Sequence, residues 1–89
     1  MSDLRRRLEL RIDSGNVPEL ELDDWDHRDY IEDVLAEHFN IDYDYVVEDE
    51  STGKFTLHFF ESTTITTLQN VIDVINRHHA LSDELYGTI

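Results

Sequence analysis

Carboxylates are the most frequent side chains that could do chemistry in this chain of 89 residues. Asp and Glu number 21 against seven Lys and Arg, and the formal net charge is −14. The segment 23–40, DDWDHRDYIEDVLAEHFN, alone holds seven carboxylates and one Arg. General acid catalysis needs a carboxyl whose pKa is raised by burial in a pocket, and a domain this small has few residues to spare for one. We therefore predict that the carboxylates serve binding and that the protein is not an enzyme.

Other catalytic and cofactor-binding patterns are weak in the sequence. With five His and 21 acids among many Ser and Thr, a Ser-His-Asp trio would arise from composition alone. The three glycines are isolated, so there is no phosphate-binding loop, and the absence of Cys excludes thiolate chemistry. His78 and His79 are adjacent, about 100° apart on a helix, and His27 lies three turns from His38. We predict no cofactor and no metal site, and interpret the histidines as core-edge or capping residues.

Four carboxylates share one side of the predicted helix. Asp26, Asp29, Asp33 and Glu37 follow one another at spacings of three and four residues, which places them along one helix face. Like charges at such spacings cost about 0.2–0.5 kcal/mol each, and Lys54 is the only lysine available to offset them. We name these four residues the acidic face and predict that they bind a partner.

Two explanations for the acidic face remain open. The composition of the chain, with six Arg to one Lys and 12 Asp to nine Glu, resembles that of proteins from extreme halophiles, especially haloarchaea. In molar salt, repulsion is screened to within about 3 Å, and carboxylates should then cover every exposed position. The alternative is a nucleic-acid mimic of viral or defence-related origin, whose carboxylates on helix 23–40 block a nucleic-acid-binding protein. The 14 acids within residues 19–50 favour mimicry, and the depletion of Lys throughout favours the halophile.

The distribution of cations argues against direct binding of DNA or RNA. Residues 1–11 contain four Arg and two acids, whereas residues 12–89 contain three cations and 19 acids. Because phosphate contacts dominate nucleic-acid affinity, most of this surface would repel a nucleic acid. We therefore expect a protein partner and a regulatory or adaptor role.

Apolar spacing predicts the strands and loops around the acidic face. Residues 8–12 alternate between apolar and polar, which predicts a half-buried strand. SGNVPEL, residues 14–20, holds the only Pro and predicts a loop that runs into LELDD, with two or three extended residues before the helix. YDYVVEDESTGKFTLHFFE, residues 43–61, predicts two strands around a turn at Ser51, Thr52 and Gly53.

The hydrophobic pattern also predicts a register for this hairpin. If Tyr43, Tyr45 and Val47 share a core face with Phe55, Leu57 and Phe59, the pairs are 43 with 59, 45 with 57 and 47 with 55. Glu48 would then oppose Lys54, and Asp44 would oppose His58, as two opposite-charge pairs on the outer face.

Two amphipathic helices complete the prediction. Asp23 or Asp24 should cap the first, Asn40 should end it, and Trp25 at its head should cover the core. The second should begin at Ser62 or one of the following Thr residues and end near Ala80. The apolar stripe of the first helix consists of Tyr30, Ile31, Val34, Leu35, His38 and Phe39.

This order of elements predicts a single α+β domain over residues 1–89. A β-α-β-β-α chain packs naturally as a two-layer sandwich, with a three-stranded sheet and two helices on one face. Strand 8–12 would lie beside the last strand, in an incomplete ferredoxin-like arrangement. The outer sheet face would be uncovered, so a homodimer is one expectation and a solvated face is the other. Without 18 consecutive apolar residues we expect no membrane span and a cytoplasmic location.

Overall fold

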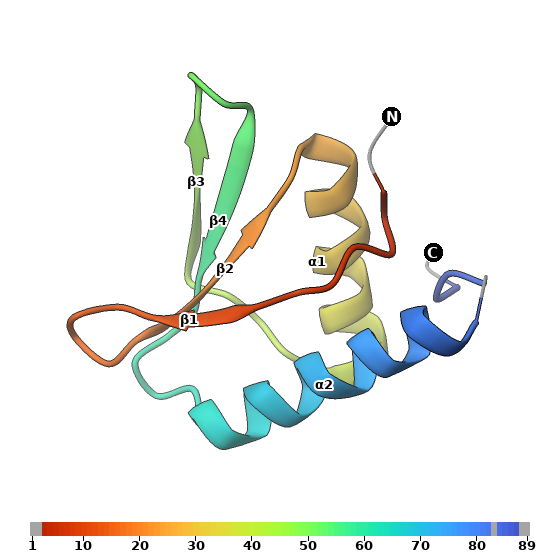
Figure 1. The fold of residues 1–89 in the computed structure, drawn as a ribbon. Coiled ribbons are helices and arrows are strands. Elements are labelled where there is room, and N and C mark those ends of the chain that lie inside the picture. Colours follow the sequence, from red (N-terminus) through yellow and green to blue (C-terminus); the bar gives the residue numbers. More distant parts are fainter. Residues whose placement is uncertain (1–2, 83, 88–89) are drawn as a thin grey trace.

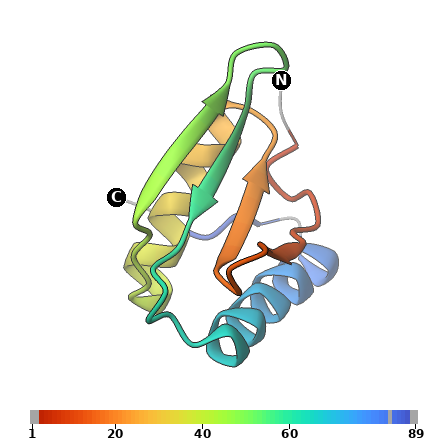
Figure 2. The same cartoon turned by 90° about the vertical axis from the view of Figure 1, so that its left-hand side faces the viewer.

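The computed structural model describes residues 3–82 and 84–87 and has an α+β fold. Residues 1–2, 83 and 88–89 of the expected 1–89 domain lie outside this description. Four antiparallel strands form one sheet in the order β1-β2-β4-β3, and both helices lie on one side of it (Figures 1 and 2). The elements are β1 (Leu10–Ile12), β2 (Pro18–Leu22), α1 (Trp25–Phe39), β3 (Tyr45–Asp49), β4 (Lys54–His58) and α2 (Ile65–Leu81).

The expectation of three strands is wrong, because residues 18–22 form a strand of their own. β2 pairs with β1 and β4, and its Leu20 and Leu22 are buried while Glu19 and Glu21 are not. The turn before it is held by the Asp13 carboxylate, which accepts the backbone N–H groups of residues 15 and 17 at 2.7 and 3.0 Å. Glu and Leu alternate in this segment, which is the pattern of a half-buried strand. A loop was predicted there because residues 14–20 also contain turn-forming residue types.

The extra strand changes which segment lies beside β4. β4 lies between β2 and β3, so the β2-α1-β3 connection is a split β-α-β unit. The expected neighbour of β4 was strand 8–12, but that place belongs to β2, and β1 is displaced to the sheet edge. β1 is also shorter than expected, since only residues 10–12 pair with β2.

The register of the β3-β4 hairpin differs by one residue from the expected one. Tyr45 pairs with His58, Val47 with Thr56, and Asp49 with Lys54. Because the side-chain period of a strand is two, this shift turns Tyr45 and Val47 to the outer face. The expected charge pairs of Glu48 with Lys54 and of Asp44 with His58 are therefore not the observed cross-strand pairs. The turn explains the shift, since Asp49 holds it by accepting the N–H and hydroxyl of Ser51 at 3.0 and 2.7 Å.

Both predicted helices are present with boundaries close to those expected. The Asp24 carboxylate accepts the N–H of His27 at 3.0 Å, which caps α1, and Asn40 ends it in the left-handed conformation with φ 56. α2 begins after Thr64, which makes no side-chain capping bond. Each helix turns one apolar stripe toward the sheet, which explains the two-layer packing.

The core lies between the sheet and the helices and includes two buried histidines. Its fully buried side chains come from every layer: Leu8, Leu20, Leu22, Ile31, Val34, Leu35, Leu57, Phe59, Leu68, Ile72 and Ile75. His27 of α1 has no exposed surface, and His79 of α2 is nearly as buried. Tyr30 joins the helices, because its hydroxyl accepts the N–H of Tyr86 at 2.9 Å and lies 2.8 Å from Nε2 of His79.

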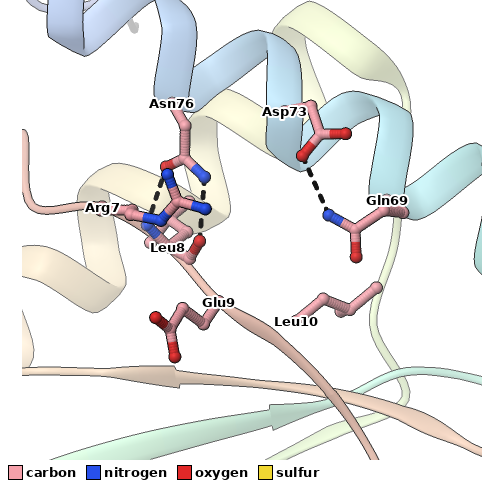
Figure 3. A pocket seen from close by; sticks show the side chains of 7 residues that line it. All are labelled: Arg7, Leu8, Glu9, Leu10, Gln69, Asp73 and Asn76. Carbon is pink, nitrogen blue, oxygen red and sulfur yellow. Dashed lines mark hydrogen bonds between the residues drawn. The ribbon is translucent and has the colours of Figure 1, made fainter.

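A side-chain amide of α2 ties the segment before β1 to the rest of the fold. Asn76 accepts the N–H of Leu8 at 2.7 Å and donates to the Leu8 carbonyl at 2.9 Å, as a paired strand would. Figure 3 shows these two bonds beside a pocket of about 280 Å³ between residues 7–10 and α2. Leu8 is thereby held in the core although it precedes the paired part of β1.

Candidate functional site

Helix α1 presents the predicted acidic face beside its buried stripe. The stripe consists of His27, Tyr30, Ile31, Val34 and Leu35. Asp26, Asp29 and Glu37 are exposed and Asp33 is half-buried. The helix begins after Asp24, and the spacing of three and four residues brings these carboxylates onto one face.

Asp33 is the electrostatic centre of the acidic face. Its pKa is raised first by desolvation and then by the charges of Asp29, Glu37 and Glu32. A raised carboxyl pKa means that the folded state disfavours the charged form of Asp33. A cation brought to this position would relieve that repulsion, which is the chemistry expected of a surface that binds basic groups.

Trp25 stands at the head of the same row and was interpreted wrongly from the sequence. It was expected to cover the core, yet 58% of its surface is exposed. Residues four apart are neighbours on a helix, so Trp25 continues the row of Asp29, Asp33 and Glu37. Exposed Trp is enriched at the energetic centres of protein interfaces. The spacing of Trp25 to Asp29 was the sequence signal for its place in this row.

The flank of the acidic face is electrically balanced. Arg28 pairs with Glu32 at 3.3 Å, and its guanidinium lies over the ring of Phe55 at 5.0 Å from the centroid. Tyr43 donates its hydroxyl to Glu32, which raises the pKa of Tyr43. Arg28 is therefore occupied with Glu32 and the sheet, and the acidic face keeps its negative charge.

The second helix carries almost no net charge, in contrast to α1. Asp73 and Arg77 are its only carboxylate and its only Lys or Arg. Its other exposed positions are mainly neutral: Thr66, Thr67, Gln69, Asn70, Val74, Ala80 and Leu81. The negative charge is thus distributed unevenly between two helices of similar length.

The outer sheet face forms a second polar surface. Arg11 lies 3.6 Å from carboxylate oxygens of both Glu19 and Glu21. Lys54 lies 3.4 Å from Glu21, and Nδ1 of His58 lies 3.5 Å from Glu19. The two carboxylates in the middle of this face, Glu19 and Glu21, are therefore paired with cations or an imidazole.

The histidines do not combine into a metal site in the described chain. Within residues 3–82 and 84–87, no three His, Asp or Glu side chains are grouped in a way that would hold a metal ion. His27 and His79 are core residues, so their side chains are more buried than the predicted core-edge positions. The sequence signal for this burial was their place on the apolar side of each helix. In the same residues, neither helix has the length and apolarity that a bilayer crossing needs.

Comparison of the chain with protein-family models, curated proteins and solved structures finds no match.

Proposed function

We propose that this protein is a small, non-enzymatic regulatory or adaptor domain whose acidic face binds a cationic surface of a partner protein. The observation that carries the proposal is the row of Trp25, Asp29, Asp33 and Glu37 on α1, in which an exposed indole lies beside mutually repelling carboxylates. An aromatic anchor with adjacent charges is the composition of an interface centre that recognises Arg or Lys.

The contrast between the helices supports this proposal over a uniformly acidic surface. If carboxylates served only to hydrate the surface, the exposed positions of α2 should be as acidic as those of α1. They are instead neutral amides and hydroxyls around the single pair of Asp73 and Arg77. The halophile-type composition remains part of the proposal, because a salt-rich cytoplasm would screen the acidic face until a partner binds.

The proposal can be tested with the fluorescence of Trp25, the only tryptophan in the chain. We would titrate the full chain with an octa-arginine peptide in moderate salt and follow the indole emission. A variant with Asp26, Asp29 and Asp33 changed to Asn and Glu37 changed to Gln should lose more than about tenfold in affinity, because each removed ion pair at a partly desolvated surface contributes about 0.5–1 kcal/mol.

The matched control removes the same charge from other elements. Glu9, Glu48, Glu50 and Glu84 are exposed and lie outside α1, and their replacement by Gln should reduce peptide affinity by about threefold or less, through net charge alone. Equal losses of peptide affinity in the two variants would contradict the proposal. They would show that the peptide binds the acidic surface without a preferred site.

The second candidate function is nucleic-acid mimicry, and the row of carboxylates along α1 is the observation that supports it. With a rise of about 1.5 Å per residue, the carboxylates of the acidic face follow one another about every 4.5–6 Å along the helix axis. The phosphates of one DNA strand advance by about 3.4 Å per nucleotide. The row is therefore less densely charged than one DNA strand, and a mimic of this kind would fill only some of the phosphate positions in the groove of a DNA-binding protein.

Competition separates mimicry from general binding of basic surfaces. A mimic should displace double-stranded DNA from a nonspecific DNA-binding protein, and the variant with a neutralised acidic face should not. Octa-arginine binding without any displacement of DNA would support the adaptor function and reject mimicry.

A further inference from the structure

The outer sheet face is a surface that the acidic face does not explain. Both helices cover the opposite side of the sheet (Figure 2), so the outward side chains of the strands have no layer over them. We define the outer sheet face by seven of these side chains: Arg11, Glu19, Glu21, Tyr45, Val47, Thr56 and His58. Tyr45 and Val47 are 53% and 47% exposed, which is unusual for two adjacent outward positions of one strand in so acidic a chain.

The outer sheet face is close to neutral in a chain of net charge −14. Arg11 on β1 and Lys54 on β4 flank the two glutamates of β2, at 3.4 to 3.6 Å from their carboxylates. A second copy of this chain would meet repulsion at the acidic face and at Glu48 and Glu50 of the β3-β4 hairpin, whereas Asp49 lies opposite Lys54 on the outer sheet face. The second copy would meet little repulsion at the outer sheet face.

One cross-strand row makes this face complementary to itself. The pairings of Arg11 with Glu19, Glu19 with His58, and His58 with Tyr45 place these four side chains in a line across the sheet. The ring of Tyr45 stacks on His58 at 4.5 Å between centroids, with 11° between the planes. The row thus runs from a guanidinium through a carboxylate and an imidazole to an aromatic ring.

Two such sheets can stack face to face about a twofold axis parallel to the strands. The row of one copy then lies over the same row of the other copy, in the reverse order. β1 then lies over β3 of the second copy, and β2 lies over its β4. Arg11 would meet the ring of Tyr45, and Glu19 would meet His58. The first contact is a cation–π pair and the second joins a carboxylate to an imidazole that can donate to it.

A hollow beside Tyr45 provides space for the incoming arginine. Its volume is about 250 Å³, and its lining includes Tyr45, His58, Asp44 and Glu61. Carboxylates next to an aromatic ring are the surroundings that a guanidinium prefers. Arg11 itself stands at the other end of the same row, held only at 3.6 Å by its own glutamates.

We propose that the outer sheet face is the contact surface of a homodimer, in which Arg11 of each copy enters the hollow beside Tyr45 of the other. The four strands cover roughly 300 Å² in projection, from a strand spacing of about 4.8 Å and about 3.3 Å per residue. This is less than the roughly 800 Å² per partner of a stable interface, so the dimer is weak. The proposal is independent of the proposed function, and it leaves both acidic faces on the outside of the dimer as a bivalent surface.

Sedimentation equilibrium of the full chain tests this dimer, at concentrations from about 10 µM to about 1 mM, spanning the range of weak association. Salt near 0.5 M would screen the net repulsion to within about 4–5 Å.

Two valines with the same exposure of 47%, Val47 on the outer sheet face and Val74 on α2, form a matched pair. Val47→Glu should weaken dimerisation by at least about tenfold, because it places a like charge at the contact. Val74→Glu adds the same charge elsewhere and should change it by about twofold or less.

Three results would overturn the proposal. The first is a wild-type chain that is monomeric throughout, the second is an equal effect of both substitutions, and the third is a loss of the dimer only in Val74→Glu. Far-UV circular dichroism checks that each variant is folded. If Val47→Glu does not fold, Tyr45→Ala replaces it and should weaken the dimer through loss of the stacked ring and the cation–π contact.

Discussion

At the scale of single residues, Asp33 and Asp26 both belong to the acidic face but lie in different electrostatic environments. Asp33 is half-buried among Asp29, Glu37 and Glu32, and its pKa is raised by desolvation and by these charges. Asp26 lies in the first turn of α1, at the positive end of the helix dipole. The same substitution should therefore have opposite effects at the two positions.

We predict that Asp33→Asn stabilises the protein and that Asp26→Asn destabilises it. Because the folded-state pKa of Asp33 is raised, its ionised form at neutral pH opposes folding, and removing the charge should add a few tenths of a kcal/mol, about 2–3 °C in Tm. Loss of the dipole interaction at Asp26 should cost about 0.3–1 kcal/mol. Thermal unfolding at pH 7 and low salt measures both, and a shift of the same sign in the two variants would contradict this account.

The buried histidines make stability depend on pH. Burial is the main cause that lowers the pKa of His27, which faces Asp23, Asp24, Asp3 and Arg6. It also lowers the pKa of His79, which faces His78, Arg5, His27 and Asp3. The Tyr30 hydroxyl accepts the N–H of Tyr86 at 2.9 Å and lies 2.8 Å from Nε2 of His79, so both groups are held inside the core. The neutral forms of both rings are therefore the ones that fit the core.

We expect the free energy of unfolding to decrease as the pH falls below 6.5, the ordinary histidine pKa. A depressed folded-state pKa means that the unfolded chain binds protons first, so this stability is complete above 6.5 and is lost as the pH falls toward the folded-state values. Urea unfolding at about pH 5.5 and about pH 7.5 measures the difference. His79→Gln should reduce it, and an undiminished difference in that variant would show that His79 is not one of the groups responsible.

At the scale of elements, the starts of the two helices show which N-cap residues make a capping hydrogen bond. Asp24 caps α1 through its carboxylate, whereas Thr64 precedes α2 without a side-chain capping bond. Both positions carry residue types that are favoured at N-caps, so sequence preference alone does not distinguish them.

Asp24→Ala should cost about 1 kcal/mol of stability, the usual contribution of an N-cap bond. Thr64→Ala should cost a few tenths of a kcal/mol or less, since α2 loses no such bond. Urea unfolding of the two variants gives the comparison, and equal losses would show that the bond from the His27 N–H to Asp24 contributes little.

The strands show why some local predictions succeeded and others did not. The helices were predictable because a period of 3.6 over 15 residues or more is a long signal, and their caps lie next to them in sequence. The register of the hairpin was not, since Tyr45 and Val47 suit a core face as well as Val46 does. The turn at Asp49 to Gly53 decides between the two registers, and one residue of difference reverses every side chain.

At the scale of the whole molecule, net charge and salt determine how easily the compact state forms. A chain with a net charge of −14 repels itself when folded, and residues 12–89 hold only three cations against 19 acids. This repulsion is long-range and therefore screened by ions, unlike the packing of the core.

Far-UV circular dichroism against salt concentration should show the folded fraction and Tm rising as NaCl increases from about 0.05 to about 2 M, over which the screening length falls well below the spacing of the carboxylates. The variant with a neutralised acidic face should need less salt. A chain that is fully folded below about 0.1 M salt, with no further gain, would remove the main support for the halophile interpretation.

The sequence by itself determined the α+β class, both helices and the residues of the acidic face, because these follow from local periodicity and composition. Tertiary structure alone decided the four-stranded order, the outward position of Tyr45 and Val47, the exposure of Trp25 and the burial of His27. The physical reason is that sheet order and register depend on pairing between segments far apart in the chain. Burial of one side chain likewise depends on whether another element arrives to cover it, which no local pattern specifies.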